Sequence, residues 1–319
     1  MNGMRRGTVR TLFNLLLPAT FALSAGLLEA QPAPPVLELV SVTPAVSLDN
    51  LIFNEATSSI TVTVGHSGGP TRYFVTASRG GSSTFEPRRM RQTFFFGLLS
   101  TFLDYNVFTP NNAIAKDLTV PISQQEVLRG NFGNTGSGYA TSTNTFTVRI
   151  PADQFVRRGT YNDEIVVSLY QGQANQPAQA VLIGQQSVSL TSVTPTVAQI
   201  ALDGQGQTTL DFGFLTAGTV REAELFFRTN AAYRIDATSE HGGVLQNVFQ
   251  SGGNPVPYQL RVDGSLVDLT SPALITLGLT VAGSSTTWET IPLSVTIGPV
   301  SGVLPGLFQD VITFTISNF

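Results

Sequence analysis

Cysteine is absent from this sequence of 319 residues, which also contains only two histidines, His66 and His241, and one tryptophan, Trp288. Without cysteine the protein has no disulfide, no thiolate nucleophile and no zinc–thiolate site. Two isolated histidines are too few for a histidine-rich metal centre. We therefore expect no bound metal and no cofactor, and each domain must derive its stability from its own core.

Charged residues are also scarce. They make up 12% of this sequence, against roughly 25% of an average soluble protein. The net charge of −4 at pH 7 provides no basic field for a nucleic-acid backbone, so we expect no nucleic-acid partner. Thr, Ser, Asn, Gln and Val take the place of the charged residues, and this composition is typical of exported β-sandwiches.

Only the N-terminus contains a long apolar run. Three arginines lie within the first ten residues, the stretch 12–28 is apolar, and Ala30 follows it. This order predicts a Sec-type signal peptide over residues 1–30, with cleavage after Ala25 as an alternative. A membrane anchor is the weaker interpretation, because Pro18 interrupts the apolar run. The mature chain is therefore expected to cross into the periplasm and to reach the cell surface or the medium.

Three short sequences occur twice in the same order. They are SVTP at 41–44 and 192–195, a related stretch at 73–81 and 233–243, and a Gly-x-aromatic-x-Asp motif at 159–163 and 306–310. The order predicts two homologous domains that open with the same strand and close with the same turn and strand. We place the first domain at 31–186 and the second at 187–319.

Both domains show the pattern of β-strands. Apolar and polar residues alternate in 60–64, in 146–150 and in 312–317. This period of two, bounded by clusters of Gly, Asn and Ser, is the signature of half-buried strands. No long helical period occurs after the signal segment. The sequence therefore predicts an all-β protein of two tandem antiparallel, Ig-like sandwiches with Greek-key connections.

The closing motif of the first domain resembles a known family. The segments 150–154 (IPADQ) and 158–167 (RGTYNDEIVV) look like the closing signature of the spore coat protein U domain. That domain also forms the subunits of Csu-type, or archaic, chaperone–usher fimbriae. Looser likeness extends over 88–90, 103–108, 228–233 and 305–315. The missing cysteine is a departure, since many members carry a disulfide, and it puts the stability of the domains in doubt.

The resemblance implies a pilin-type sandwich that lacks its last strand and receives it from a neighbouring subunit. It also implies a periplasmic chaperone and an outer-membrane usher as partners. The closing strand 310–317 is followed in the sequence by no further strand, so the second domain is expected to be incomplete. In the first domain, the segment 179–190 is expected to complete the sandwich within the chain.

The position in a fibre is predicted from the N-terminal side. Only residues 31–35 precede the first expected strand, so we expect no free donor arm and therefore a tip subunit. The alternative is that 36–44 is itself a donor arm, in which case the protein is a non-adhesive structural subunit of a shaft or of a spore or cell coat.

The repeated closing motif has a local physical reason. Glycine permits the tight backbone before the strand, the aromatic ring covers the end of the sandwich, and the aspartate binds amides of a turn. We assign these residues to fold architecture and not to a site: Gly159, Tyr161, Asp163, Gly306, Phe308 and Asp310.

The most unusual segment is FFFGLLSTFL at 94–103. Consecutive apolar residues in a strand point to both faces, whereas a sandwich strand has only one inner face. Some of these side chains are therefore expected to lie outward, at the distal end, and to bind an apolar surface. A buried strand or a short helix under a loop is the alternative. The candidate binding residues are Phe94, Phe95, Phe96, Leu98, Leu99 and Phe102.

No catalytic constellation is found, so we expect that the protein is not an enzyme. His66 and His241 lie in polar, glycine-containing segments that are typical of solvated turns. Trp288 could stack on a sugar, but a lone tryptophan is more often a packing residue. The sequence thus favours a fimbrial tip adhesin that mediates attachment or biofilm formation.

Overall fold

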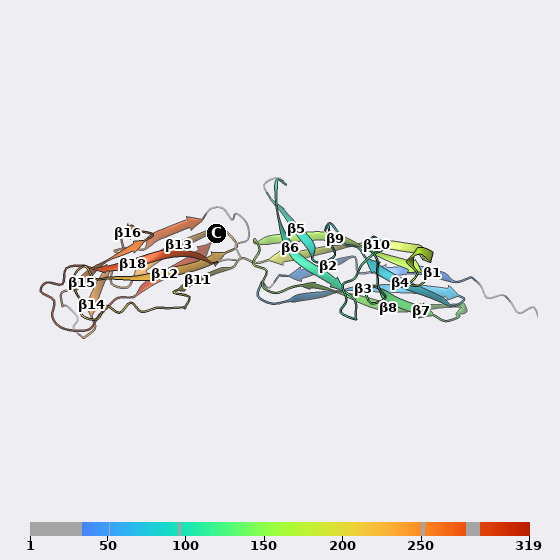
Figure 1. Cartoon of the computed structure of the whole chain (residues 1–319), viewed down its shortest axis with the longest axis horizontal. Helices are drawn as coiled ribbons and strands as arrows, with labels where there is room; N and C mark the ends of the chain where they lie inside the picture. Colours follow the sequence, from blue (N-terminus) through green and yellow to red (C-terminus); the bar gives the residue numbers. More distant parts are fainter. Residues whose placement is uncertain (1–33, 51, 95–96, 250–252, 279–287) are drawn as a thin grey trace, which may run out of the picture.

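The computed structural model describes residues 34–319 except 51, 95–96, 250–252 and 279–287. The predicted signal peptide and the residues Phe95 and Phe96 lie outside the described residues. Two β-domains follow one another along the long axis of the molecule (Figure 1). The described residues contain no helix that is long and apolar enough to cross a membrane.

The first domain consists of ten strands and one short 3-10 helix, and the chain runs through them as follows. They are β1 (Val36–Val42), β2 (Ala45–Asp49), β3 (Ala56–Gly68), β4 (Thr71–Ala77), β5 (Arg88–Phe94), β6 (Leu99–Phe108), β7 (Leu128–Phe132), β8 (Gly136–Ile150), β9 (Gly159–Gln171), η1 (Pro177–Gln179) and β10 (Val181–Thr194).

These strands form two layers. One layer has the order β1-β3-β8-β6, and the other contains β7-β4-β9-β10-β2. The β5–β6 hairpin joins the layers, because β5 pairs with both β6 and β9. All pairs are antiparallel except β10 with β2, which runs parallel. The prediction of an all-β sandwich is confirmed, and the parallel pair is an addition to it.

The alternation in the sequence produces the core. Ile60, Val62 and Val64 of β3 are fully buried, while the intervening Thr61 and Thr63 point outward because successive side chains of a strand alternate between faces. The core of the first domain is formed in this way by both layers.

Strand β10 completes the first domain along its whole length. It pairs with β9 from Val181 to Thr194, so the boundary expected after residue 186 falls within β10. The sequence 192–194 therefore pairs inside the first domain and does not open the second, although SVTP at 192–195 was expected to do so. This repeat was misleading because a short strand sequence carries no information about the sheet in which it pairs.

The second domain follows the same plan with fewer residues. Its strands are β11 (Ala198–Leu202), β12 (Val220–Thr229), β13 (Tyr233–Ser239), β14 (Val244–Asn247), β15 (Val256–Val262), β16 (Ser265–Val267), β17 (Ala273–Gly278), β18 (Glu289–Ile297), β19 (Phe308–Gln309) and β20 (Ile312–Asn318).

Most strand pairings of the first domain recur in the second. The layer β11-β12-β18-β15 has the same arrangement as β1-β3-β8-β6, and β17-β13-β20 has that of β7-β4-β9. The bridging hairpin is also repeated, because β14 pairs with β15 and with β19 as β5 pairs with β6 and β9. The described residues contain no counterpart of β2 or β10 in the second domain.

A buried asparagine joins the two domains. The Asn230 side chain donates to the carbonyl oxygens of Val156 (3.1 Å) and Pro195 (2.8 Å), and it accepts from the amide of Val197 (2.8 Å). The backbone carbonyl oxygen of Asn230 accepts a hydrogen bond from the amide of Arg158 at 3.1 Å. Val156 and Arg158 belong to the first domain, so this fully buried amide binds both domains at once.

An arginine packs beside this amide. The guanidinium of Arg228 lies 5.4 Å from the ring centre of Phe53 and 5.0 Å from that of Phe155, both in the first domain. The Trp288 ring of the second domain lies at 4.8 Å from the same group. These cation–π contacts give Trp288 a packing role at the junction.

We expect the Asn230→Ala substitution to loosen the junction. It leaves the carbonyl oxygens of Val156 and Pro195 without their donor, which costs about 1–3 kcal/mol in a buried site. Small-angle X-ray scattering should show a wider range of interdomain angles, and calorimetry should separate the unfolding of the two domains. The exposed control Asn175→Ala should change neither measurement.

Candidate functional site

The second domain exposes one edge of its closing strand. In the first domain, β9 pairs with β4 on one side and with β10 on the other. In the second domain, β20 pairs with β13 alone among the described residues. Backbone amide and carbonyl groups along the other edge of β20 are thus available for a further strand. We call this feature the open edge.

The core side chains beside the open edge are incompletely covered. In β9 the inward residues Ile165, Val167 and Leu169 are fully buried. Their counterparts in β20, which are Ile312, Phe314 and Ile316, are only half-buried. Apolar residues at corresponding positions differ in exposure because the first domain has β10 beside them.

Strand β11, in the opposite layer, is also incompletely covered. It contacts β20, and all five of its residues are half-buried. In the first domain β1 contacts β10 as well as β9. The open edge is therefore flanked by partly exposed apolar residues of both layers, at the place where the first domain has its last strand.

The aspartate of the closing motif holds a turn in the first domain. Asp163 accepts hydrogen bonds from the Tyr105 hydroxyl (2.6 Å) and from the amides of Gly81 (2.9 Å) and Glu164 (2.8 Å). Burial, followed by the neighbouring Asp163 carboxylate, raises the pKa of the Tyr105 hydroxyl far above its ordinary value. The hydroxyl therefore stays protonated and remains a donor.

The second domain repeats this arrangement. Asp310 accepts from the Tyr258 hydroxyl (2.5 Å), from Ser239 Oγ (2.5 Å) and from the amide of His241 (3.0 Å). Burial, followed by the hydrogen bond to Asp310, raises the pKa of the Tyr258 hydroxyl in the same direction. The pair Asp310–Tyr258 thus corresponds to Asp163–Tyr105, and sequence reasoning had not found the tyrosines.

The other motif residues differ between the domains. Gly159 has φ +130° and lies where a Cβ atom would overlap the Gln92 side chain, whereas Gly306 has no positive φ. The Tyr161 hydroxyl donates to the carbonyl oxygen of Arg157 at 2.8 Å, which fastens the turn four residues upstream. Phe308 has no hydroxyl, so the turn of the second domain lacks this bond.

The described residues of the candidate binding segment lie at the end of β5, at the start of β6 and between them. Leu98 is 83% and Leu99 is 50% exposed, and Phe102 is also exposed on β6. Phe94 is half-buried and its ring lies 4.0 Å below the Arg157 guanidinium. The neighbouring Leu103 is fully buried, as the alternation of a strand requires.

The hairpin rises from the body of the first domain beside the junction with the second (Figure 1). Its tip is therefore not at the end of the molecule that points away from the second domain, which is where the sequence analysis expected an adhesive segment. The reason is the strand pairing: Arg91 of β5 pairs with Asn162 near the start of β9. Strand β9 begins at the junction, directly after Arg158, whose amide binds Asn230.

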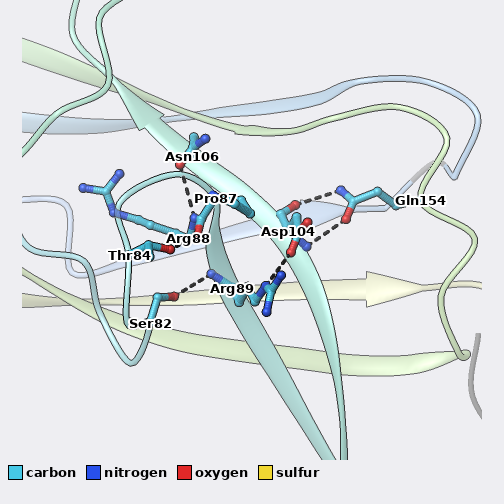
Figure 2. Close-up of polar contacts among 8 residues, drawn as sticks. All are labelled: Ser82, Thr84, Pro87, Arg88, Arg89, Asp104, Asn106 and Gln154. Carbon is cyan, nitrogen blue, oxygen red and sulfur yellow. Dashed lines mark hydrogen bonds and ion pairs between the residues drawn. The ribbon is translucent and has the colours of Figure 1, made fainter.

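Polar contacts fix the base of the hairpin (Figure 2). The backbone amide of Asp104 in β6 donates to Gln154 Oε1 at 2.7 Å, and Gln154 Nε2 donates to the backbone carbonyl oxygen of Asp104 at 2.8 Å. The carboxylate of Asp104 binds Arg89 Nε at 3.0 Å, and the amide of Arg89 donates to Ser82 Oγ at 2.6 Å. The side chain of Gln154 thus replaces the missing strand neighbour of Asp104.

A buried arginine anchors β5. The Arg88 guanidinium is fully buried and donates to the carbonyl oxygens of Ser78 (3.0 Å), Ala77 (3.2 Å) and Ala115 (2.6 Å). Burial lowers the pKa of Arg88 to about 10, so the group is still charged at neutral pH. The hairpin is therefore held rigidly at its base while its apolar tip is exposed.

The expectation of a solvated histidine in a turn was wrong for His66. His66 lies in β3, is fully buried and stacks on the Phe132 ring at 4.9 Å. His241 is partly buried, with Nδ1 at 3.2 Å from Asp310. The glycine next to His66 continues a strand instead of making a turn.

The cluster around Asp310 does not have the geometry of a nucleophilic triad. Ser239 Oγ donates to the carboxylate of Asp310, whereas a nucleophilic serine needs its hydrogen bond to the imidazole. The described part of the chain also contains no group of three or more His, Asp or Glu residues that could hold a metal ion.

Comparison with known proteins gives structural neighbours but no sequence family. No family model and no curated protein matches the chain. The chain is similar to the crystal structure of the CsuC–CsuE chaperone–tip adhesion subunit complex from archaic chaperone–usher Csu pili of Acinetobacter baumannii, at 16% identity and a TM-score of 0.43. The match covers 86% of this chain and 99% of that one.

Two further solved structures show weaker similarity. The CupB6 tip adhesin from Pseudomonas aeruginosa has 11% identity and a TM-score of 0.31, over 88% of this chain and 93% of that one. The CooA pilin subunit from enterotoxigenic Escherichia coli has 12% identity and a TM-score of 0.30, over 50% and 98%. The resemblance to the spore coat protein U domain stays a prediction.

We expect the Gln154→Ala substitution to free the base of the hairpin. It removes both hydrogen bonds to the Asp104 backbone, so the free energy of unfolding should fall by about 1–3 kcal/mol. Hydrogen exchange of the Asp104 amide should accelerate, while the exposed control Gln179→Ala should leave it unchanged. Unaltered exchange in Gln154→Ala would show that the hairpin is held by other contacts.

Proposed function

We propose that this protein is the tip subunit of a chaperone–usher surface fibre, and that its second domain accepts a β-strand from the neighbouring subunit. The observation that carries this proposal is the open edge of β20, beside core residues that are half-buried only in the second domain. The role is binding and structural, without a catalytic reaction.

The first domain shows what the donated strand must contain. Val188 and Leu190 of β10 are fully buried in the first domain, two residues apart as a strand requires. An added strand with the same alternation would cover Ile312, Phe314 and Ile316. Each fully buried apolar side chain contributes roughly 1.5–3 kcal/mol, in addition to the backbone pairing.

The tip position is supported by the state of the first domain. It has its completing strand β10 within the chain, and β1 pairs with β3 while Leu37 and Val42 are buried. The segment 36–42 thus has a place in its own domain, which argues against a free donor arm. A structural subunit of a shaft or coat is the second candidate.

Export and assembly follow from the same proposal. The predicted Sec signal would bring the chain to the periplasm, where a chaperone would cover the open edge until the usher exchanges it for the donor strand. An uncovered edge beside apolar residues would otherwise pair with other chains and aggregate.

The exposed tip of the β5–β6 hairpin is the proposed adhesive surface. Leu98, Leu99 and Phe102 are exposed on an element whose base is held by Gln154 and Arg88. A rigid base lowers the entropy lost when apolar side chains bind a surface. Because the hairpin lies beside the junction, we propose that it contacts apolar surfaces with the flank of the tip subunit, and that many fibres together support attachment or biofilm formation.

Strand addition can be tested by fusion. Residues 172–194 are appended after Phe319, so that a second copy of the β9–β10 connection and of β10 can fold back along β20. We expect the melting temperature of the second domain to rise clearly, because the half-buried side chains become covered. The matched control carries Val188→Asp and Leu190→Asp in the appended copy only. Equal melting temperatures of both fusions and the parent chain would refute an incomplete second domain.

Adhesion can be tested by substituting the tip. The triple variant Leu98→Ser, Leu99→Ser and Phe102→Ser should fold and be displayed normally, because these side chains are exposed, and attachment to polystyrene should be lost. The control Leu103→Ser changes the buried neighbour and should destabilise the domain by about 2–5 kcal/mol. A stable, displayed triple variant that still attaches would leave the hairpin without an adhesive role.

A further inference from the structure

Three loops lie together at the end of the second domain that points away from the first. They are 203–219, the described residues 248–249 and 253–255, and 298–307, and hydrogen bonds tie them to one another and to the adjoining strand ends. The amide of Gly218 donates to Ile297 (2.8 Å), Val248 to Leu307 (2.8 Å), and the side chain of Asn254 to Gly302 (3.2 Å). We call this surface the far end.

The far end carries large apolar side chains without cover. Phe214 is 99% and Phe249 is 78% exposed, and Leu304 and Leu307 are more than half exposed. Each of the three loops contributes at least one of them. Single exposed apolar residues are ordinary, but a group on one set of linked loops indicates a contact surface.

The same three connections exist in the first domain. The loop 203–219 precedes β12 as the loop 50–55 precedes β3, and 248–255 links β14 to β15 as the hairpin tip links β5 to β6. The loop 298–307 follows β18 as 151–158 follows β8. The far end of the second domain is thus the counterpart of the junction end of the first.

The junction end of the first domain is covered by a domain. Phe155 and Val156 are buried there, Asn230 binds the 151–158 loop, and Arg228 packs on Phe53 and Phe155. In the first domain, this end therefore receives the end of the following β-sandwich.

The direction of a strand added to β20 determines where the domain that follows this strand lies. Strand β10 runs antiparallel to β9, ends at the junction and leads through 195–197 into β11. Strand β20 runs from the far end toward the junction, where the amide of Phe319 binds Ala232. A strand added antiparallel to β20 therefore leaves at the far end, and its own domain begins there.

We propose that the far end is the docking surface for the β-sandwich domain of the subunit that donates its strand, so that neighbouring subunits repeat the junction within this chain. This inference rests on the proposed function. Alignment on the closing motif places Pro305 at the position of Arg158, and proline has no amide hydrogen to donate. The hydrogen bond from the Arg158 amide therefore has no equivalent at the far end, where the exposed side chains of Phe214, Phe249 and Leu304 offer an apolar contact instead.

The test uses the full chain extended by a second copy of residues 172–319. The appended β10 can complete the second domain, and the appended 195–319 can then dock on the far end. A spin label at Gln259→Cys in both copies of the second domain reports their separation, since the chain has no other cysteine. We expect a narrow distance distribution in this extended chain.

The variant carries Phe214→Ser, Phe249→Ser and Leu304→Ser in the original second domain only. We expect its distance distribution to become about twofold broader, because relative motion of domains is the default when their interface is weak. The matched control replaces Leu266, Leu274 and Leu277 with serine, which are exposed elsewhere on the same domain. The control should remain narrow.

The outcomes separate this inference from the proposed function. If the extension does not raise the melting temperature of the original second domain, strand completion itself fails. If the melting temperature rises but the extended chain and its triple variant have equally wide distance distributions, strand completion stands and only the docking inference is overturned. Concentration-dependent dimers of the unextended chain that vanish in the triple variant would assign the far end to self-association and overturn the proposed occupant.

Discussion

A strand inside a β-sandwich needs hydrogen-bond partners on both edges and apolar cover on its inner face, and this constraint separates the two domains. The first domain meets it with β10, which pairs along the whole of β9 and buries Ile165, Val167 and Leu169. In the second domain β20 has a single partner among the described strands, and its inner face is half-covered. The main asymmetry of the molecule follows from one strand.

The absence of cysteine gives buried polar contacts more weight. An aspartate–tyrosine pair holds the closing turn of each domain, and the Gln154 side chain pairs with the backbone of β6. At the junction, Asn230 satisfies its donors and acceptor with groups of the linker and of the first domain. A buried polar group without a partner costs free energy, so these contacts favour the one geometry of hairpin, turn and junction in which every group is paired. No disulfide is present to fix that geometry.

The junction and the hairpin belong to the same end of the domain plan. That end receives a following domain in the first half of the chain, and it lies uncovered in the second half. The hairpin tip of the first domain emerges beside the junction, where the second domain leaves its exposed residues free (Figure 1). The contact with the following domain and the exposed apolar residues Leu98, Leu99 and Phe102 thus belong to the same end of the first domain.

The sequence by itself determined the all-β class and the repeated closing motif, because these depend on alternation and on local turn chemistry. Alternation at 60–64 and 146–150 predicts strands with a buried face, and the structure has them as β3 and β8. Only the tertiary structure decided which strands pair and which distant side chains are in contact. It placed 192–194 in the first domain, buried His66 against Phe132, and set Gln154 against Asp104, fifty residues away. It also put the apolar hairpin beside the junction and not at the outer end. A strand sequence states which residues face inward, but the neighbour of each strand edge depends on chain topology, and contacts between distant residues form only when that topology is complete.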